Sequence, residues 1–144
     1  MRLGPLAIAA VAGASMAVQG TLNAILGKHV GGFEASFIVH MIGAALLGLA
    51  LLTGITGGSL KGAAQAPWHS FLGGPLSVLI IWGVLTSVGE AGVSAANTAI
   101  VSSQILAALA LDALGLSSRE FNFTWMKAIG AILLIAGTYM LLKE

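Results

Sequence analysis

The sequence predicts an all-α membrane protein with five transmembrane helices, and three observations lead to this prediction. Of the 144 residues, 58% are hydrophobic and only 8% are charged, against about 25% charged residues in a typical soluble domain. Five apolar runs come close to or exceed the roughly 20 residues that a helix needs to cross the hydrocarbon layer. The runs are continuous, whereas the strands of a membrane barrel alternate apolar and polar residues. We expect a single five-helix domain over residues 1–144, with spans at about 3–26, 33–56, 71–89, 92–116 and 125–142.

The first span carries an unusual polar face. Ser15, Gln19 and Asn23 follow each other at four-residue spacing and therefore stack along one side of a helix. Amide groups inside a membrane need partners or water, so we expect Gln19 and Asn23 to line a cavity that binds a solute. Hydrogen bonding between neighbouring helices is the simpler alternative.

The start of this span also resembles a secretory signal sequence, with a basic residue, an apolar middle and small residues up to Ala17. The apolar helical pattern continues to Leu26, beyond the length of a typical signal core. We therefore expect a retained membrane helix.

The second span contains His40 with Ser36 one turn before it, on the same face. A single histidine among apolar residues is most often a neutral packing residue held by hydrogen bonds. Its ordinary pKa near 6.5 also lets a histidine exchange a proton at physiological pH. We assign both residues to the predicted solute site and leave the proton-exchange role open.

Trp68 precedes the third span. The span ends at a tight turn that contains Glu90, and we expect the carboxylate of this residue to be hydrated. Trp68 and Trp125 stand where aromatic residues gather at membrane interfaces, at the start of the third and fifth spans. Trp82, by contrast, lies in the middle of a span.

The fourth span shows two stripes. Asn97 and Gln104, seven residues apart, form a polar stripe, and we assign both to the solute site. A stripe of small residues predicts close approach of another helix. It consists of Ala95, Ala99, Ser103 and Ala107.

Two carboxylates are predicted to be structural or coupling charges. Asp112 lies near the end of the fourth span, where the helix dipole disfavours an anion, so we expect Arg119 or Lys127 to compensate it. Glu90 is the second of these charges. In the fifth span, Gly130 and Gly137 lie seven residues apart and predict either a dimer seam or ordinary packing within the chain.

The basic residues at or near the ends of the spans are almost evenly divided between the two sides. Arg2, Lys61, Arg119 and Lys127 fall on the side of the N-terminus, and Lys28 and Lys143 fall on the other. The excess of four over two weakly favours an inside N-terminus. Because this difference is small, insertion in both orientations is also permitted, and hence an antiparallel homodimer.

Several classes of function have no support in the sequence. The chain has no cysteine, and its three histidines, His29, His40 and His69, are scattered, so we expect neither a metal site nor another cofactor. Catalytic motifs are missing, and we expect no enzymatic activity. A net charge of +1 gives no basic patch for nucleic acid.

Three motifs resemble the short, five-helix YdcZ-like branch of the drug/metabolite transporter superfamily. They are QGTLNAILGKHVG (19–31), SSQILAALALDALGL (102–116) and GAILLIAGTYMLL (130–142). The resemblance implies a five-helix inner-membrane protein built like half of a ten-helix transporter and expected to pair, and it points to Gln19, Asn23, Gln104 and Asp112. One departure is Glu90, which stands where such proteins often have an arginine.

Together these patterns predict a secondary transporter of a small metabolite or drug-like solute in the bacterial inner membrane. We expect it to work by alternating access as a homodimer or with a paired homologous subunit, surrounded by the lipid bilayer. The alternative is a non-transporting scaffold or accessory subunit whose polar residues serve assembly only.

Overall fold

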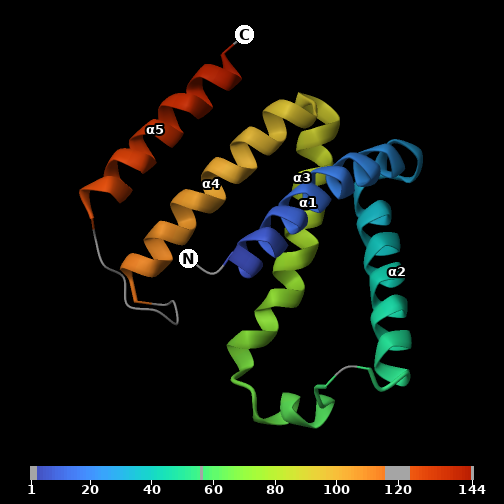
Figure 1. Cartoon of the computed structure of the whole chain (residues 1–144). Coiled ribbons are helices and arrows are strands. Elements are labelled where there is room, and N and C mark those ends of the chain that lie inside the picture. The colour runs from blue at the N-terminus through green and yellow to red at the C-terminus, as the bar shows by residue number, and fades with distance from the viewer. Residues whose placement is uncertain (1–2, 56, 116–123, 144) are drawn as a thin grey trace. The chain divides into compact units, whose positions relative to one another are not determined.

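The computed structural model describes residues 3–55, 57–115 and 124–143, and all regular structure within these ranges is helical (Figure 1). Its elements in chain order are α1 (Leu3–Val30), α2 (Gly32–Leu52), the short 3-10 helices η1 (Leu60–Gln65) and η2 (Trp68–Leu72), α3 (Gly73–Ala91), α4 (Val93–Ala113) and α5 (Trp125–Leu142). Five helical stretches are long and apolar enough to cross a membrane, the third being η2 together with α3. The predicted all-α membrane fold is confirmed. Arg2, Arg119 and the predicted span ends at 56 and 116 lie outside the described residues.

The first helix is longer than the membrane requires. Its 28 residues extend to Val30, four beyond the predicted end of the first span. At 1.5 Å per residue it measures about 42 Å, against a hydrocarbon layer of roughly 30 Å. Lys28 and His29 occupy its last turn, where positive charge complements the helix dipole. The helix therefore continues past the predicted end of the span, Leu26, into a last turn that carries two basic residues.

A single residue, Gly31, joins α1 to α2. Its φ of 99° lies in the region that only glycine adopts readily, and a Cβ there would collide with the carboxylate of Glu34. Gly31 donates its N–H to the Gly27 carbonyl at 2.9 Å and accepts the N–H of Ala35 at 3.0 Å. Its backbone thus belongs to both helices, which makes the corner tight.

The contacts divide the chain into two units, Met1–Glu90 and Ala91–Glu144. In the first unit, α3 packs against both preceding helices. A Cβ on Gly20 would lie 2.8 Å from Val84 Cγ1, and one on Gly27 would lie 3.2 Å from Leu85 Cδ1. Small residues on α1 therefore allow α3 to approach closely, as is common between helices in membranes.

The contact between α2 and α3 is partly aromatic. The rings of Phe33 and Trp82 stack with centroids 5.5 Å apart and planes 15° apart. Two turns further along α2, His40 meets Ser77, which lies earlier on α3. The order of these two contacts shows that α2 and α3 run antiparallel.

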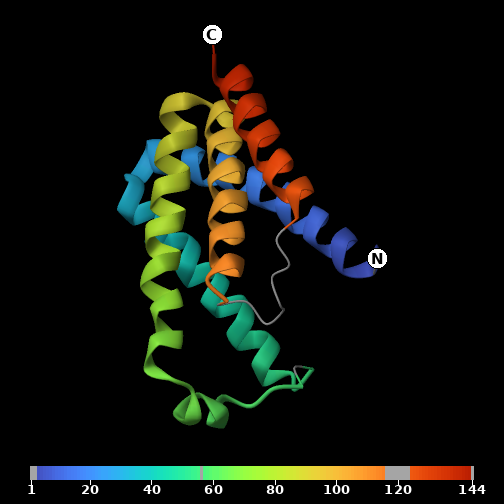
Figure 2. The same ribbon diagram turned by 90° about the vertical axis from the view of Figure 1, so that its left-hand side faces the viewer.

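The second unit consists of α4 and α5, which lie side by side (Figures 1 and 2). The hydroxyl groups of Ser102 on α4 and Thr138 on α5 form a hydrogen bond across the contact. Ser102 also donates to the Thr98 carbonyl within its own helix at 2.7 Å. One polar contact between small side chains thus fixes the register of this helix pair.

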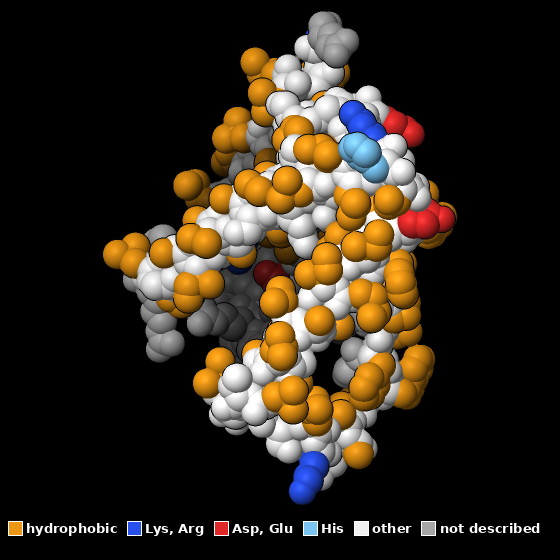
Figure 3. Space-filling model, turned by 90° about the vertical axis from the view of Figure 1, so that its right-hand side faces the viewer, with side chains coloured by type: hydrophobic (Ala, Val, Ile, Leu, Met, Phe, Trp, Pro, Cys, Tyr) orange, Lys and Arg blue, Asp and Glu red, His pale blue; other side chains and the backbone are white. Residues whose placement is uncertain are grey.

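Large apolar side chains are mostly exposed in both units, and charged side chains are few on the face that Figure 3 shows. The buried hydrophobic residues are small or medium-sized: Ala24, Ala35, Leu85, Val88 and Ala96. This distribution is the reverse of that in a soluble domain, where large apolar residues fill the core. It is the pattern expected of helices whose outer faces meet lipid.

Candidate functional site

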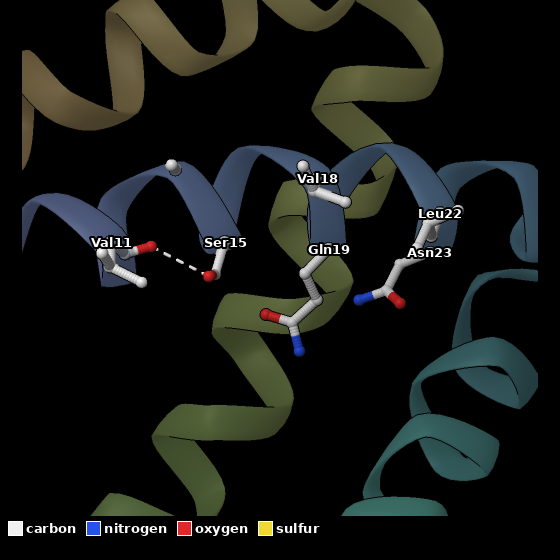
Figure 4. A pocket seen from close by; sticks show the side chains of 7 residues that line it. Val11, Ser15, Val18, Gln19, Leu22 and Asn23 are labelled. Atoms are coloured by element: carbon white, nitrogen blue, oxygen red, sulfur yellow. Dashed lines mark hydrogen bonds between the residues drawn. The ribbon is translucent and has the colours of Figure 1, made fainter.

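A groove of about 470 Å³ runs along one face of α1 (Figure 4). We call it the α1 groove. Its lining residues all come from about three and a half turns of this helix: Val11, Ala14, Ser15, Val18, Gln19, Leu22 and Asn23. The predicted polar face and the groove therefore coincide, because residues four apart fall on one side of the helix. No charged side chain is among these seven.

The three polar side chains in the groove differ in how they are satisfied. Ser15 donates its hydroxyl to the Val11 carbonyl of its own helix at 2.9 Å. Gln19 and Asn23 form no hydrogen bond with any described residue. In Figure 4 both amides extend to the same side of the helix. Ser15 is thus occupied locally, whereas the two amides remain available to a ligand.

Asn23 is the more informative of the two amides because it is almost entirely buried. Only 6% of its surface is exposed, yet its carboxamide still borders the groove. The amide nitrogen and oxygen of Asn23 are not fully enclosed, so they are open to the groove, where a ligand or water can form hydrogen bonds with them. This access makes the groove the strongest candidate for a solute site in the first unit.

Ser36 and His40 lie one turn apart on α2, at the contact with α3 rather than in the α1 groove. His40 Nδ1 lies 2.7 Å from the Ser36 carbonyl oxygen, and Nε2 lies 3.0 Å from the hydroxyl oxygen of Ser77. Ser77 in turn donates its hydroxyl to the Gly74 carbonyl at 2.7 Å. The imidazole is held at both nitrogen atoms by two different helices.

The hydroxyl of Ser36 itself has no hydrogen-bond partner among the described residues. The residue is 2% exposed, and its oxygen is fully enclosed. Hydroxyls in membrane helices usually bond to a carbonyl one turn earlier, as Ser15 does here. Ser36 is therefore an exception that calls for a partner such as water.

In the second unit, Asn97 borders a groove of about 350 Å³ between α4 and α5. Ser102, Gly137 and Thr138 also line it. Asn97 donates from Nδ2 to the Val93 carbonyl at 2.8 Å, which leaves its side-chain oxygen as an acceptor. Gln104 is exposed and does not line this groove. The two residues of the predicted polar stripe thus have different surroundings within the unit.

The two predicted charges are at helix ends. Glu90 is the penultimate residue of α3 and is exposed, and Asp112 is the penultimate residue of α4 and is half-buried. Neither carboxylate forms an ion pair with a residue in the described ranges. Arg119, one of the two partners expected for Asp112, lies outside those ranges.

The two glycines of the predicted seam have free space beside them. Gly130 is exposed and Gly137 is half-buried, and a Cβ on either would meet nothing within 4 Å. Contacts among the described residues thus do not require glycine at these positions.

Sequence reasoning missed Ser77 and the pair formed by Ser102 and Thr138. Each is a small hydroxyl residue in an apolar run, and such residues usually bond to their own helix. For Ser77, the available signal was a polar residue between apolar ones in the span that follows that of His40. The register between α2 and α3 that brings Ser77 to His40 depends on tertiary packing. The pattern of residues along a single helix does not predict this register.

Comparison with known proteins identifies the family of this chain. Residues 4–140 match the family described as "Putative inner membrane exporter, YdcZ", a branch of the drug/metabolite transporters. The chain belongs to this family. The match covers nearly its whole length, and it confirms the resemblance drawn from the three sequence motifs. No curated protein and no solved structure gives a significant match.

Family membership places the protein in the inner membrane and among transporters rather than enzymes. The five apolar helices agree with a multi-pass protein. Among the residues that the structure describes, there is no cluster of three or more metal-ligating side chains.

Proposed function

We propose that the protein is a secondary transporter that binds a small, uncharged, amphipathic solute in the α1 groove. The observation that carries the proposal is the pair of unpartnered amides, Gln19 and Asn23, one of them almost fully buried. A carboxamide offers both a donor and an acceptor, so it suits a solute with amide or hydroxyl groups. The apolar residues around the amides suit a hydrocarbon or aromatic portion of the same solute.

The absence of charge in the groove supports an uncharged solute. An ion that left water for this site would find no opposite charge among the seven lining residues. Desolvating an unpaired ion costs far more than a few neutral hydrogen bonds return. A neutral solute meets no such penalty.

We propose that the working unit is a dimer. By alternating access it would expose the solute site first to one side of the membrane and then to the other. The α1 groove is open along its length, so a closed chamber needs further walls, which a second copy would help to supply. Gly130 and Gly137 leave room for a neighbouring helix, because a Cβ there meets nothing within 4 Å. Ser36, His40, Asn97 and Gln104 remain proposed members of the chamber, with Asp112 and Glu90 as structural or coupling charges. The solute would shift the balance between two packings through its different affinity for each.

Ligand-induced stabilisation of the purified protein in lipid nanodiscs tests the solute site. We expect N-acetylphenylalaninamide and nicotinamide, both uncharged, to raise the melting temperature, and tetraphenylphosphonium and benzoate to leave it unchanged. Binding at 100 times Kd stabilises a protein by about 2.7 kcal/mol, which is easily measured. In N23L and Q19L we expect binding to weaken at least tenfold.

The matched control is S15A, because Ser15 lines the same groove but its hydroxyl is already bonded to Val11. S15A should bind the neutral probes like the natural protein. If the leucine variants lose dimers but no probe ever stabilises the natural protein, the scaffold function is favoured over transport. If the charged probes bind and the neutral ones do not, the proposed solute class is wrong.

A further inference from the structure

We propose that His40 and Ser77 form a reversible proton-binding site between α2 and α3, through which a proton gradient drives the transport. The link to transport rests on the function proposed above. The proton site itself rests on the geometry around His40 and can be tested without any solute.

The evidence is that neutral His40 and Ser77 together have fewer hydrogen atoms to donate than there are hydrogen-bond contacts around them. Three contacts surround the site: His40 Nδ1 with the Ser36 carbonyl (2.7 Å), His40 Nε2 with the Ser77 hydroxyl (3.0 Å), and the Ser77 hydroxyl with the Gly74 carbonyl (2.7 Å). Neutral histidine brings one N–H and serine brings one O–H, which serve two contacts only. An imidazolium brings a second N–H, and all three contacts then become hydrogen bonds.

The carbonyl contact determines the tautomer of the neutral ring. A carbonyl oxygen only accepts, so Nδ1 carries the hydrogen and Nε2 has the free lone pair. In this state the Ser77 hydroxyl has one hydrogen and two acceptors, Nε2 and the Gly74 carbonyl. On proton uptake, an N–H bond forms at Nε2, the ring gains one positive charge, and Ser77 accepts from the ring while donating to Gly74.

The other ionisable groups that the structure describes in the first unit do not share this site. Lys28 and His29 are in the last turn of α1, Glu34 is in the first turn of α2, and Glu90 is at the end of α3. Lys61 and His69 lie in the 3-10 helices that precede α3. In the described residues, none of these six forms an ion pair or hydrogen bond with His40. The proton that binds here is therefore held by neutral dipoles.

His29 provides an internal comparison. Its Nδ1 also lies 2.9 Å from the carbonyl one turn earlier, that of Ile25. Its Nε2, however, has no contact of the kind that Ser77 makes with His40. The second contact, between helices, is thus what distinguishes His40.

Proton uptake at this point can affect the α1 groove because α3 contacts both. Ser77 on α3 meets His40, and two turns later Val84 on the same helix lies against Gly20. Gly20 is adjacent in sequence to Gln19 in the groove. A change in the contact between α2 and α3 therefore acts on the helix that packs behind the proposed solute site.

Nitrogen NMR of histidine-labelled protein in nanodiscs tests the proton site directly. The background variant H29Q/H69Q leaves His40 as the sole histidine in the chain. On acidification we expect one transition, from the Nδ1–H tautomer to the imidazolium. In this background, S77A should change the course of this titration, because the ring loses its partner at Nε2.

The matched control for S77A is S87A. Ser87 is also on α3 and bonds to the carbonyl three residues earlier, that of Val84, but it does not contact His40. The proposal is overturned if His40 stays in one protonation state throughout, if its neutral form carries the hydrogen on Nε2, or if S77A titrates like S87A.

Flux of N-acetylphenylalaninamide into proteoliposomes, with and without a pH gradient, tests the coupling. For the natural protein, H29Q and S87A we expect a gradient to change flux at least fivefold. In S77A the ratio of the two fluxes should fall toward one. An unchanged ratio in S77A, or complete loss of flux under both conditions, contradicts coupling through the contact of His40 with Ser77. A natural protein that carries no probe refutes the proposed transport, and the NMR titration then decides the proton site by itself.

Discussion

Single residues of this protein show where polar groups in the membrane find partners and where they do not. Ser15, Thr21, Ser87 and Ser102 all donate to carbonyls of their own helices. Gln19, Asn23 and the hydroxyl of Ser36 have no such bond among the described residues. The sequence identified all three as candidates because of their four-residue spacing and their place within apolar runs. It could not separate them from Ser15, because side-chain bonding to the backbone depends on rotamers.

Replacing Ser36 with alanine should not destabilise the protein. Its hydroxyl is enclosed and unpartnered, so we expect S36A to leave the free energy of unfolding unchanged or to raise it by about 1 kcal/mol. Reversible unfolding in mixed micelles measures this difference, and S102A serves as the comparison because Ser102 bonds to Thr138 across the helix contact. A loss of more than about 1 kcal/mol in S36A would mean that a bound water completes the hydroxyl.

At the scale of elements, the arrangement of the first unit depends on how closely its helices approach. Gly20 faces Val84 on α3 with no room for a side chain between them. The apolar pattern predicts five helices because each must be long and hydrophobic to cross lipid. It does not predict which faces meet, because lipid and protein offer apolar groups equally well and small residues decide the contact.

Gly20 and Gly13 on the same helix allow a direct test of this close approach. A Cβ on Gly20 would lie 2.8 Å from Val84 Cγ1, whereas one on Gly13 meets nothing within 4 Å. We expect G20A to lower the free energy of unfolding by about 1–3 kcal/mol through overpacking. G13A should be neutral or stabilising, because alanine favours the helix over glycine by about 1 kcal/mol. Equal effects of the two substitutions would show that α3 does not press against α1 at Gly20.

At the scale of the whole molecule, composition was the most reliable guide. A chain with 8% charged residues and 58% hydrophobic residues can fold only where lipid solvates its surface, and the large apolar side chains are indeed exposed. Orientation is less determined, because four basic residues on one side against two on the other is a weak bias. How two subunits meet, and how Gln19 lies relative to Gln104, depends on the packing of helices against one another. The periodicity of residues within one helix does not predict either.

The lack of natural cysteine makes orientation directly measurable. Each single variant K28C, K61C or K143C carries one thiol in the entire protein. With five spans and one orientation, a membrane-impermeant maleimide added to intact cells should label either K61C alone or both K28C and K143C. Insertion in both orientations would instead give about half-maximal labelling at all three positions. Labelling of K28C and K61C from the same side only would contradict the five-span topology.

The stacking of Phe33 on Trp82 has a practical consequence. Of the three indoles, Trp82 alone lies within a helix interior at the contact between α2 and α3, while Trp68 and Trp125 begin helical segments. Replacing those two by phenylalanine would leave one tryptophan, whose emission wavelength and quenching respond to its ring neighbour. The fluorescence of this double variant would thus report changes in the distance between α2 and α3 during transport without an attached dye.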